Sequence, residues 1–132
     1  MNRVLIVDDE IQICENLTKI LVKKGYAVFE AHNGMEALER LRGQDVEVVL
    51  LDMRMPVMDG ITALKRIKED FPDTVVIMVT AISDKAVVES CIEAGAFGYL
   101  DKPINLQDVF REIDRALEYR RSTRRGDENE SA

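Results

Sequence analysis

Five short apolar runs alternate along the chain with five segments of helical periodicity, and this alternation limits the possible folds more than any other feature. The runs cover residues 4–7, 27–31, 46–51, 74–80 and 96–100. The first run, Val-Leu-Ile-Val, is continuously apolar, as expected of a strand buried on both faces of a sheet. Such alternation predicts parallel strands, right-handed crossovers and helices on both faces. We therefore expect a doubly wound, five-stranded parallel α/β fold with strand order 2-1-3-4-5.

Each intervening segment carries apolar residues at helical spacing, and the fourth of these stripes is the weakest. The stripes, in chain order, are Ile11, Cys14, Leu17 and Leu21; Met35, Leu38 and Leu41; Ile61, Leu64, Ile67 and Phe71; Val87, Cys91 and Ala94; and Leu106, Val109, Phe110, Ile113 and Leu117. The predicted N-caps are Asn33, Ser83 and Asn105, and the predicted helix-ending glycines are Gly25, Gly43 and Gly95.

The composition indicates one globular domain that functions in solution. Of the 132 residues, 46% are hydrophobic and 33% are charged, and the net charge is −7. An acidic domain is a poor ligand for nucleic acid, and the apolar runs are too short to cross a bilayer. The N-terminus enters a strand at once, so we expect a cytoplasmic protein. We expect the domain to cover residues 1–120, and residues 121–132 to form a charged tail or the start of a linker.

The predicted strands end on polar residues that suit one kind of chemistry. Asp8 and Asp9 follow the first strand, Asp52 follows the third, Thr80 ends the fourth, and Lys102 lies just beyond the fifth. In an open parallel sheet, ligands bind in the crevice beyond the carboxyl ends of the strands. A crevice with three carboxylates, a hydroxyl and an ammonium is suited to a divalent cation and a phosphoryl group.

These strand ends also carry a family resemblance over nearly the whole chain, to about Tyr119. The matching pieces are Val7-Asp8-Asp9, Leu51-Asp52-Met53-Arg54-Met55-Pro56, Met58-Asp59-Gly60, Val79-Thr80-Ala81, Gly95-Ala96 and Leu100-Asp101-Lys102-Pro103. Together and in this order they resemble a receiver domain of the two-component response-regulator family, which has the flavodoxin-like CheY fold. By that resemblance, residues 1–120 would be the receiver domain.

The resemblance implies that Asp52 is the phosphoacceptor and that a sensor histidine kinase supplies the phosphoryl group. Mg²⁺ would be held by Asp8, Asp9, Asp52 and the backbone carbonyl of Arg54. Asp9 and Asp52 would be direct ligands, and Asp8 would act through a water, because Mg²⁺ favours few carboxylates and several waters.

The resemblance also assigns the remaining residues of the crevice. Lys102 would pair with a phosphoryl oxygen, and the bond to Pro103 would be cis. Thr80 would donate its hydroxyl to the phosphoryl group, and Tyr99 would then swing inward, so that these two form the switch pair. The fourth helix, fifth strand and fifth helix would form the face that binds a downstream output domain or protein. Homodimerisation on phosphorylation stays an open alternative.

Two flanking positions are expected to set how long the phosphoryl group lasts. Arg54 lies two residues after Asp52, and Ile82 lies two residues after Thr80. Neither side chain offers a carboxylate or an amide that could orient an attacking water. We therefore expect slow self-dephosphorylation and no turnover of a separate substrate.

Two other functions use similar parts. A Mg²⁺-dependent phosphohydrolase with an aspartate nucleophile would fit the crevice, but the chain has no insertion long enough for a substrate cap. A flavin binder would need a phosphate-cradling loop after the first strand, which the sequence lacks. His32 is expected to be a surface side chain, and Cys14 and Cys91 are expected to be buried thiols.

Overall fold

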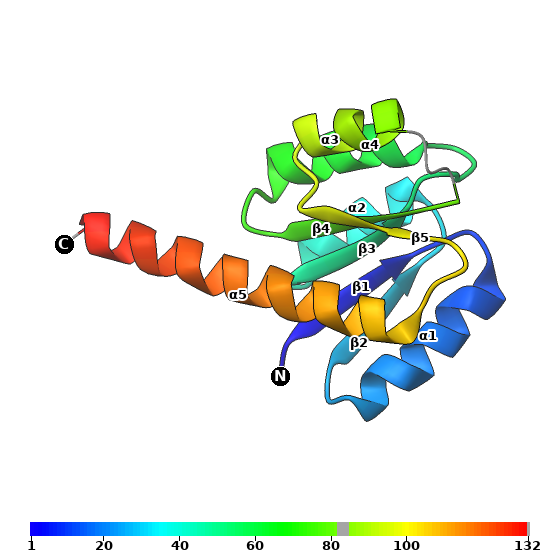
Figure 1. Cartoon of the computed structure of the whole chain (residues 1–132), viewed down its shortest axis with the longest axis horizontal. Coiled ribbons are helices and arrows are strands. Elements are labelled where there is room, and N and C mark those ends of the chain that lie inside the picture. Colours follow the sequence, from blue (N-terminus) through cyan, green and yellow to red (C-terminus); the bar gives the residue numbers. More distant parts are fainter. Residues whose placement is uncertain (82–84, 132) are drawn as a thin grey trace.

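The fold is a five-stranded parallel sheet in the order β2-β1-β3-β4-β5, as predicted. The computed structural model describes residues 1–81 and 85–131, and their side chains as far as residue 123. The strands are β1 (Arg3–Val7), β2 (Ala27–Ala31), β3 (Val48–Asp52), β4 (Val75–Thr80) and β5 (Gly98–Asp101). Every residue of β3 and β4 is buried, because both faces of the sheet are covered at its centre (Figure 1).

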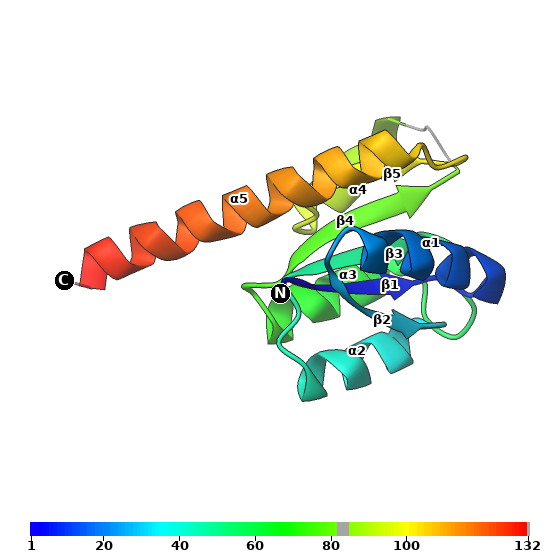
Figure 2. The same cartoon turned by 90° about the horizontal axis from the view of Figure 1, so that it is seen from below.

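Helices cover both faces of the sheet in two separate cores. They are α1 (Ile11–Lys23), α2 (Gly34–Gly43), α3 (Gly60–Asp70), α4 (Lys85–Glu93) and α5 (Leu106–Ser131). Buried residues of α1 and α5 pack together on one face, and those of α2, α3 and α4 pack on the other (Figure 2). This is the doubly wound arrangement that the alternating pattern predicts.

Local signals in the sequence explain where several helices begin and end. Asn33 Oδ1 accepts a hydrogen bond from Glu36 N at 2.9 Å, and Asn105 Oδ1 accepts one from Gln107 N at 2.9 Å, which confirms both N-caps. Gly25 and Gly95 follow α1 and α4 with φ of 100° and 109°. Glycine adopts this left-handed backbone without strain, so it ends a helix at little cost. The predicted cap Ser83 lies outside the described residues.

Three apolar residues that were assigned to the buried stripes are exposed instead. Ile11, Met35 and Leu106 have exposed fractions of 58%, 44% and 41%. Each stands in the first turn of its helix. In a β-α unit the helix begins beyond the carboxyl end of the preceding strand, so its first turn lies past the sheet that would cover it. In α1 and α5 the buried residues accordingly begin only at Cys14 and Val109.

The fifth helix is longer than the apolar stripe indicates. Its stripe ends at Leu117, yet the helix continues to Ser131 and extends past the body of the domain (Figures 1 and 2). The segment expected to be a charged tail or the start of a linker is thus helical as far as Ser131. No helix in the described part of the chain is both long and apolar enough to cross a membrane.

Candidate functional site

Three aspartates meet at the carboxyl edge of the sheet. Asp8 and Asp9 directly follow β1, and Asp52 is the last residue of β3. One carboxylate oxygen from each lies within 4.8 Å of the others. Asp8 and Asp52 are buried, with exposed fractions of 3% and 4%, whereas Asp9 is exposed. The structure therefore brings together the three carboxylates that were predicted to share one site, with Asp9 on the solvent side.

Lys102 supplies the positive charge of the site. Its Nζ lies 3.2 Å from Asp52 Oδ1 and 3.5 Å from Asp8 Oδ2. The Lys102–Pro103 peptide bond is cis, as the resemblance implies. Lys102 N also donates a hydrogen bond to Thr80 O at 2.8 Å, which ties the end of β5 to the end of β4. The ammonium is thus held between the two buried carboxylates.

The charges in the site are unevenly balanced. Burial raises the pKa of Asp52, and the neighbouring Asp8 raises it further, while Lys102 and the backbone N–H of Arg54 oppose the shift. Burial alone would lower the pKa of Lys102, but Asp52 and Asp8 together raise it above its usual value. The site therefore contains one ammonium and three carboxylates, which is an excess of negative charge.

A small, hard divalent cation fits this excess of negative charge. Oxygen donors from a few carboxylates, with room for water on the exposed side of Asp9, form the donor set that Mg²⁺ prefers. The Arg54 side chain is exposed, and the backbone N–H of Arg54 donates a hydrogen bond to the Asp52 carboxylate. The expected role of the Arg54 carbonyl as a ligand stays a prediction.

The loop after Asp52 is folded back onto the strand end by Asp59 and Gly60. Gly60 N donates to Met53 O at 3.0 Å. A Cβ at Gly60 would lie 2.6 Å from Asp52 O and 2.7 Å from Met53 Cα, so only glycine fits against this backbone. Asp59 Oδ1 accepts a hydrogen bond from Thr62 N at 2.8 Å and caps α3. This cap was not predicted, although an aspartate before a helical stripe is a sufficient signal.

The two predicted switch residues lie on adjacent strands but in different surroundings. Thr80 is 2% exposed at the end of β4, whereas Tyr99 on β5 is 43% exposed. In the register of the sheet, Tyr99 pairs with Met78, and Asp101 pairs with Thr80. The tyrosine is thus on the surface in this structure, and the threonine is buried at the carboxyl end of β4. Ile82, the second predicted modulator, lies outside the described residues.

Both cysteines are buried free thiols, as predicted. Cys14 Sγ lies 3.4 Å from Asp8 O, to which it donates a hydrogen bond. Burial, with the charges of Asp8 and Glu30, raises the pKa of the Cys14 thiol to about 12. The thiol of Cys14 is therefore a neighbour of the acidic site.

His32 lies at the surface, as predicted, but one of its ring nitrogens is buried. The side chain is 38% exposed, but its Nε2 atom is buried, 3.9 Å from Glu30 Oε1. Residues two apart on a strand point to the same side. The spacing of Glu30 and His32 was the signal that could have placed these two side chains together.

A parallel sheet in the order 2-1-3-4-5, with three aspartates, a lysine and a threonine at its carboxyl edge, defines the class of CheY-like signalling domains. The comparison with protein families agrees, because residues 4–114 match the family described as the response regulator receiver domain. The chain belongs to this family and is a response regulator receiver domain of two-component systems.

Relatives of known name support the same conclusion. The chemotaxis protein CheY of Bacillus subtilis is 38% identical over 117 residues, which cover 88% of this chain and 98% of that protein. A cyclic di-GMP phosphodiesterase of Thermotoga maritima is 39% identical over 89% of this chain, and the transcriptional regulatory protein ZraR of Klebsiella oxytoca is 38% identical over 89%. The matches span only 31% and 27% of these two longer proteins. These relatives do not favour the phosphohydrolase alternative.

Solved structures share the fold. A CheY-like receiver domain protein from Methanospirillum hungatei superposes with a TM-score of 0.89 at 29% identity, covering 93% of this chain and 98% of the other. A receiver domain protein from Clostridium thermocellum gives a TM-score of 0.88 at 30% identity, covering 93% and 99%.

Proposed function

We propose that this receiver domain accepts a phosphoryl group on Asp52 from a sensor histidine kinase and passes the signal to a partner. The observation that carries the proposal is the position of the Asp52 carboxylate. It is buried at the carboxyl end of β3, beside Asp8 and Asp9, with the Lys102 ammonium 3.2 Å away. A carboxylate so placed is a nucleophile beside a cation that can neutralise part of the charge of an incoming phosphoryl group.

In the proposed step, a carboxylate oxygen of Asp52 forms a bond to phosphorus. The phosphorus–nitrogen bond of the kinase phosphohistidine breaks, and its electron pair stays with the departing imidazole. Such transfers depend on positioning and on neutralising charge at the phosphoryl oxygens. Lys102 Nζ would leave Asp52 Oδ1 for a phosphoryl oxygen, and the Thr80 hydroxyl would donate to another. Mg²⁺ held by Asp8, Asp9 and Asp52 would offset the negative charge of the carboxylates and the phosphoryl group.

Loss of the phosphoryl group is proposed to be slow and self-catalysed, so the domain is not a turnover enzyme. Hydrolysis needs a side chain that orients water at phosphorus. The Arg54 side chain is exposed and offers only donors. The half-life of the isolated phosphoprotein measures this directly, and loss of the label within seconds would contradict the proposal.

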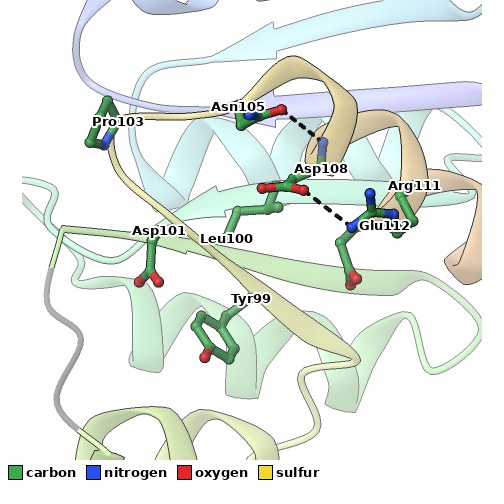
Figure 3. A pocket seen from close by; sticks show the side chains of 8 residues that line it. All are labelled: Tyr99, Leu100, Asp101, Pro103, Asn105, Asp108, Arg111 and Glu112. Atoms are coloured by element: carbon green, nitrogen blue, oxygen red, sulfur yellow. Dashed lines mark hydrogen bonds and ion pairs between the residues drawn. The ribbon is translucent and has the colours of Figure 1, made fainter.

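The signal is proposed to leave through the face formed by α4, β5 and α5. A cavity of about 360 Å³ lies on this face, lined by Tyr99 and Asp101 of β5 and by Asp108, Arg111 and Glu112 of α5 (Figure 3). Two of its three carboxylates are already in ion pairs, since Asp108 Oδ1 lies 3.3 Å from Arg111 Nη1 and Glu112 Oε1 lies 2.7 Å from Arg115 Nη1. A partner would therefore meet the 43% exposed Tyr99 side chain beside a surface of paired charges.

The cytoplasm is the proposed compartment. Cys14 and Cys91 are both free thiols, which fits a reducing environment.

The experiment that tests the proposed function is phosphorylation by radiolabelled acetyl phosphate with Mg²⁺. Wild type is expected to take up one acid-stable, alkali-labile label, and Asp52→Asn is expected to take up none. Asp59→Asn is the matched control, because it removes a carboxylate from the same loop while asparagine can still cap α3. Equal labelling of wild type and Asp52→Asn would refute the assignment, as would loss of labelling in Asp59→Asn alone.

A further inference from the structure

A second group of metal-ligating side chains lies between α1 and β2. It consists of Cys14 on α1, Glu30 on β2 and His32 just after β2. One ligand atom from each, a sulfur, a carboxylate oxygen and a ring nitrogen, lies within 4.8 Å of the other two. This group shares no residue with the acidic site, and the Cys14 hydrogen bond to Asp8 O connects the two.

The fold explains why these three side chains converge. Glu30 and His32 continue the alternation that begins at Val28, so all three point to the same side of the strand. Val28 packs against the core cluster that contains Cys14, which places that side under α1. Cys14 itself is fully buried on the inner face of α1. The convergence therefore follows from the packing of α1 on β2 and not from a chance surface contact.

The His32 ring has an unused nitrogen inside this group. His32 Nε2 is buried and has no hydrogen-bond partner in the described part of the chain. Its nearest carboxylate oxygen, Glu30 Oε1, is 3.9 Å away, beyond hydrogen-bonding distance. Buried polar atoms are rarely left without a partner, and each exception calls for an explanation. A bound cation between the nitrogen and the carboxylate would provide one.

We propose that Cys14, Glu30 and His32 form a binding site for Zn²⁺ or a similar divalent transition-metal ion. Thiolate, imidazole and carboxylate are the three ligand types that Zn²⁺ takes in proteins. Tetrahedral coordination at the usual bond lengths puts ligand atoms about 3.3–3.7 Å apart. The 3.9 Å between His32 Nε2 and Glu30 Oε1 needs only a small adjustment to reach that range.

Binding would exchange one bond for another at Cys14. The thiol releases its proton to solvent as the sulfur–metal bond forms, and it gives up its hydrogen bond to Asp8 O. The His32 ring nitrogen is buried but the Glu30 side chain is 29% exposed, so water could approach the fourth position from the Glu30 side. The chemistry differs from that of the acidic site, whose three carboxylates favour a hard cation such as Mg²⁺.

The direct test is Co²⁺ binding by the whole chain, with Mg²⁺ in excess to occupy the carboxylates of the acidic site. A thiolate bound to Co²⁺ gives a charge-transfer absorption band that carboxylate ligands do not give. We expect one equivalent of Co²⁺ to produce this band and Zn²⁺ to abolish it. Cys14→Ala should remove the band, whereas Cys91→Ala, which removes the other buried thiol, should keep it.

His32→Gln keeps the test valid if Cys14→Ala does not fold, because the His32 side chain is partly exposed. This variant should weaken Co²⁺ binding by at least about 10-fold. Zn²⁺ should also raise the Tm of wild type, because it binds the folded state, and this rise should be absent in His32→Gln. The proposal is overturned if wild type gives no thiolate band, or if the band is unchanged in His32→Gln.

Discussion

The carboxyl edge of the sheet has two halves, one around the end of β3 and one around the end of β4. The helices that follow these two strands differ in how firmly they are packed. On one half, Asp52 is followed by α3, which buries Gly60, Ala63, Leu64 and Ile67. On the other half, Thr80 is followed by α4, of which only Cys91 is buried in the part that the structure describes. Asp52, the proposed phosphoacceptor, thus precedes a well-packed helix. Thr80, which is proposed to bind the phosphoryl group as part of the switch, precedes a loosely packed one.

This difference suits a domain that must both react and respond. A phosphoacceptor needs a fixed position relative to Lys102, since the transfer depends on geometry. A switch needs an element that moves at low free-energy cost, and such elements are those with few buried apolar contacts. Under the proposed function, phosphorylation would have to shift the balance of α4 and Tyr99 by only a few kcal/mol.

The largest expected effect compares one truncation in each helix. Leu64→Ala in α3 removes a fully buried side chain and should lower the free energy of unfolding by about 2–5 kcal/mol. Val87→Ala in α4 removes a partly buried one and should cost about 1 kcal/mol or less. Urea denaturation of both variants measures the two losses. Equal losses would show that α4 is held as firmly as α3 and would remove the basis of the comparison.

A smaller effect tests whether burial of the charged Asp52 carboxylate lowers the stability of the folded protein. Burial and Asp8 raise the folded-state pKa of Asp52 above 3.8, so the folded protein binds this proton more tightly than the unfolded chain. The stability linked to this proton is complete below the unfolded pKa and is lost as pH rises through the raised folded pKa. Asp52→Asn avoids that loss, and Lys102 keeps its pairing with Asp8.

Asp52→Asn should therefore be more stable than wild type at neutral pH without Mg²⁺, on the order of 1 kcal/mol. The difference should disappear below the ordinary Asp value of 3.8. Thermal unfolding at a series of pH values, with a chelator present, measures it. A variant that is less stable than wild type at neutral pH would show that the Lys102 ion pair outweighs the burial of Asp52.

Much of the candidate site was predictable because its signals are local. Apolar runs mark the strands, and the residue after each run must lie at the carboxyl edge, so Asp8, Asp52 and Lys102 could be assigned to one crevice before the structure was known. The exposed Ile11 and Met35 were missed because helical spacing does not show how far the sheet extends beneath a first turn. Extended helical structure after Leu117 was missed because that segment has no apolar stripe.

The cluster of Cys14, Glu30 and His32 was missed for a different reason. The relation between Glu30 and His32 is local, but the approach of Cys14 depends on how α1 lies on β2. Contacts between elements follow from packing, which single-sequence patterns specify only as a buried face. Sequence alone thus predicts a site most reliably where the backbone topology brings its residues together.

The smallest expected effect concerns how α3 is anchored, and two N-caps provide a matched pair. Asp59→Ala in α3 and Asn33→Ala in α2 each remove one side-chain bond to a backbone N–H and should each cost about 1 kcal/mol at neutral pH. Their pH dependence should differ. The bond from Thr62 N lowers the pKa of Asp59, so its contribution is present above 3.8 and is lost as pH falls through the lowered folded pKa.

The cost of Asp59→Ala should therefore shrink in acid, while that of Asn33→Ala, which replaces an uncharged cap, should stay constant. Urea denaturation of both variants and wild type, at neutral pH and below 3.8, measures the two costs. If the Asp59→Ala cost is the same at both pH values, the carboxylate charge contributes nothing to the cap. The firm hold on α3 would then rest on its buried face alone, and the contrast with α4 would be one of packing only.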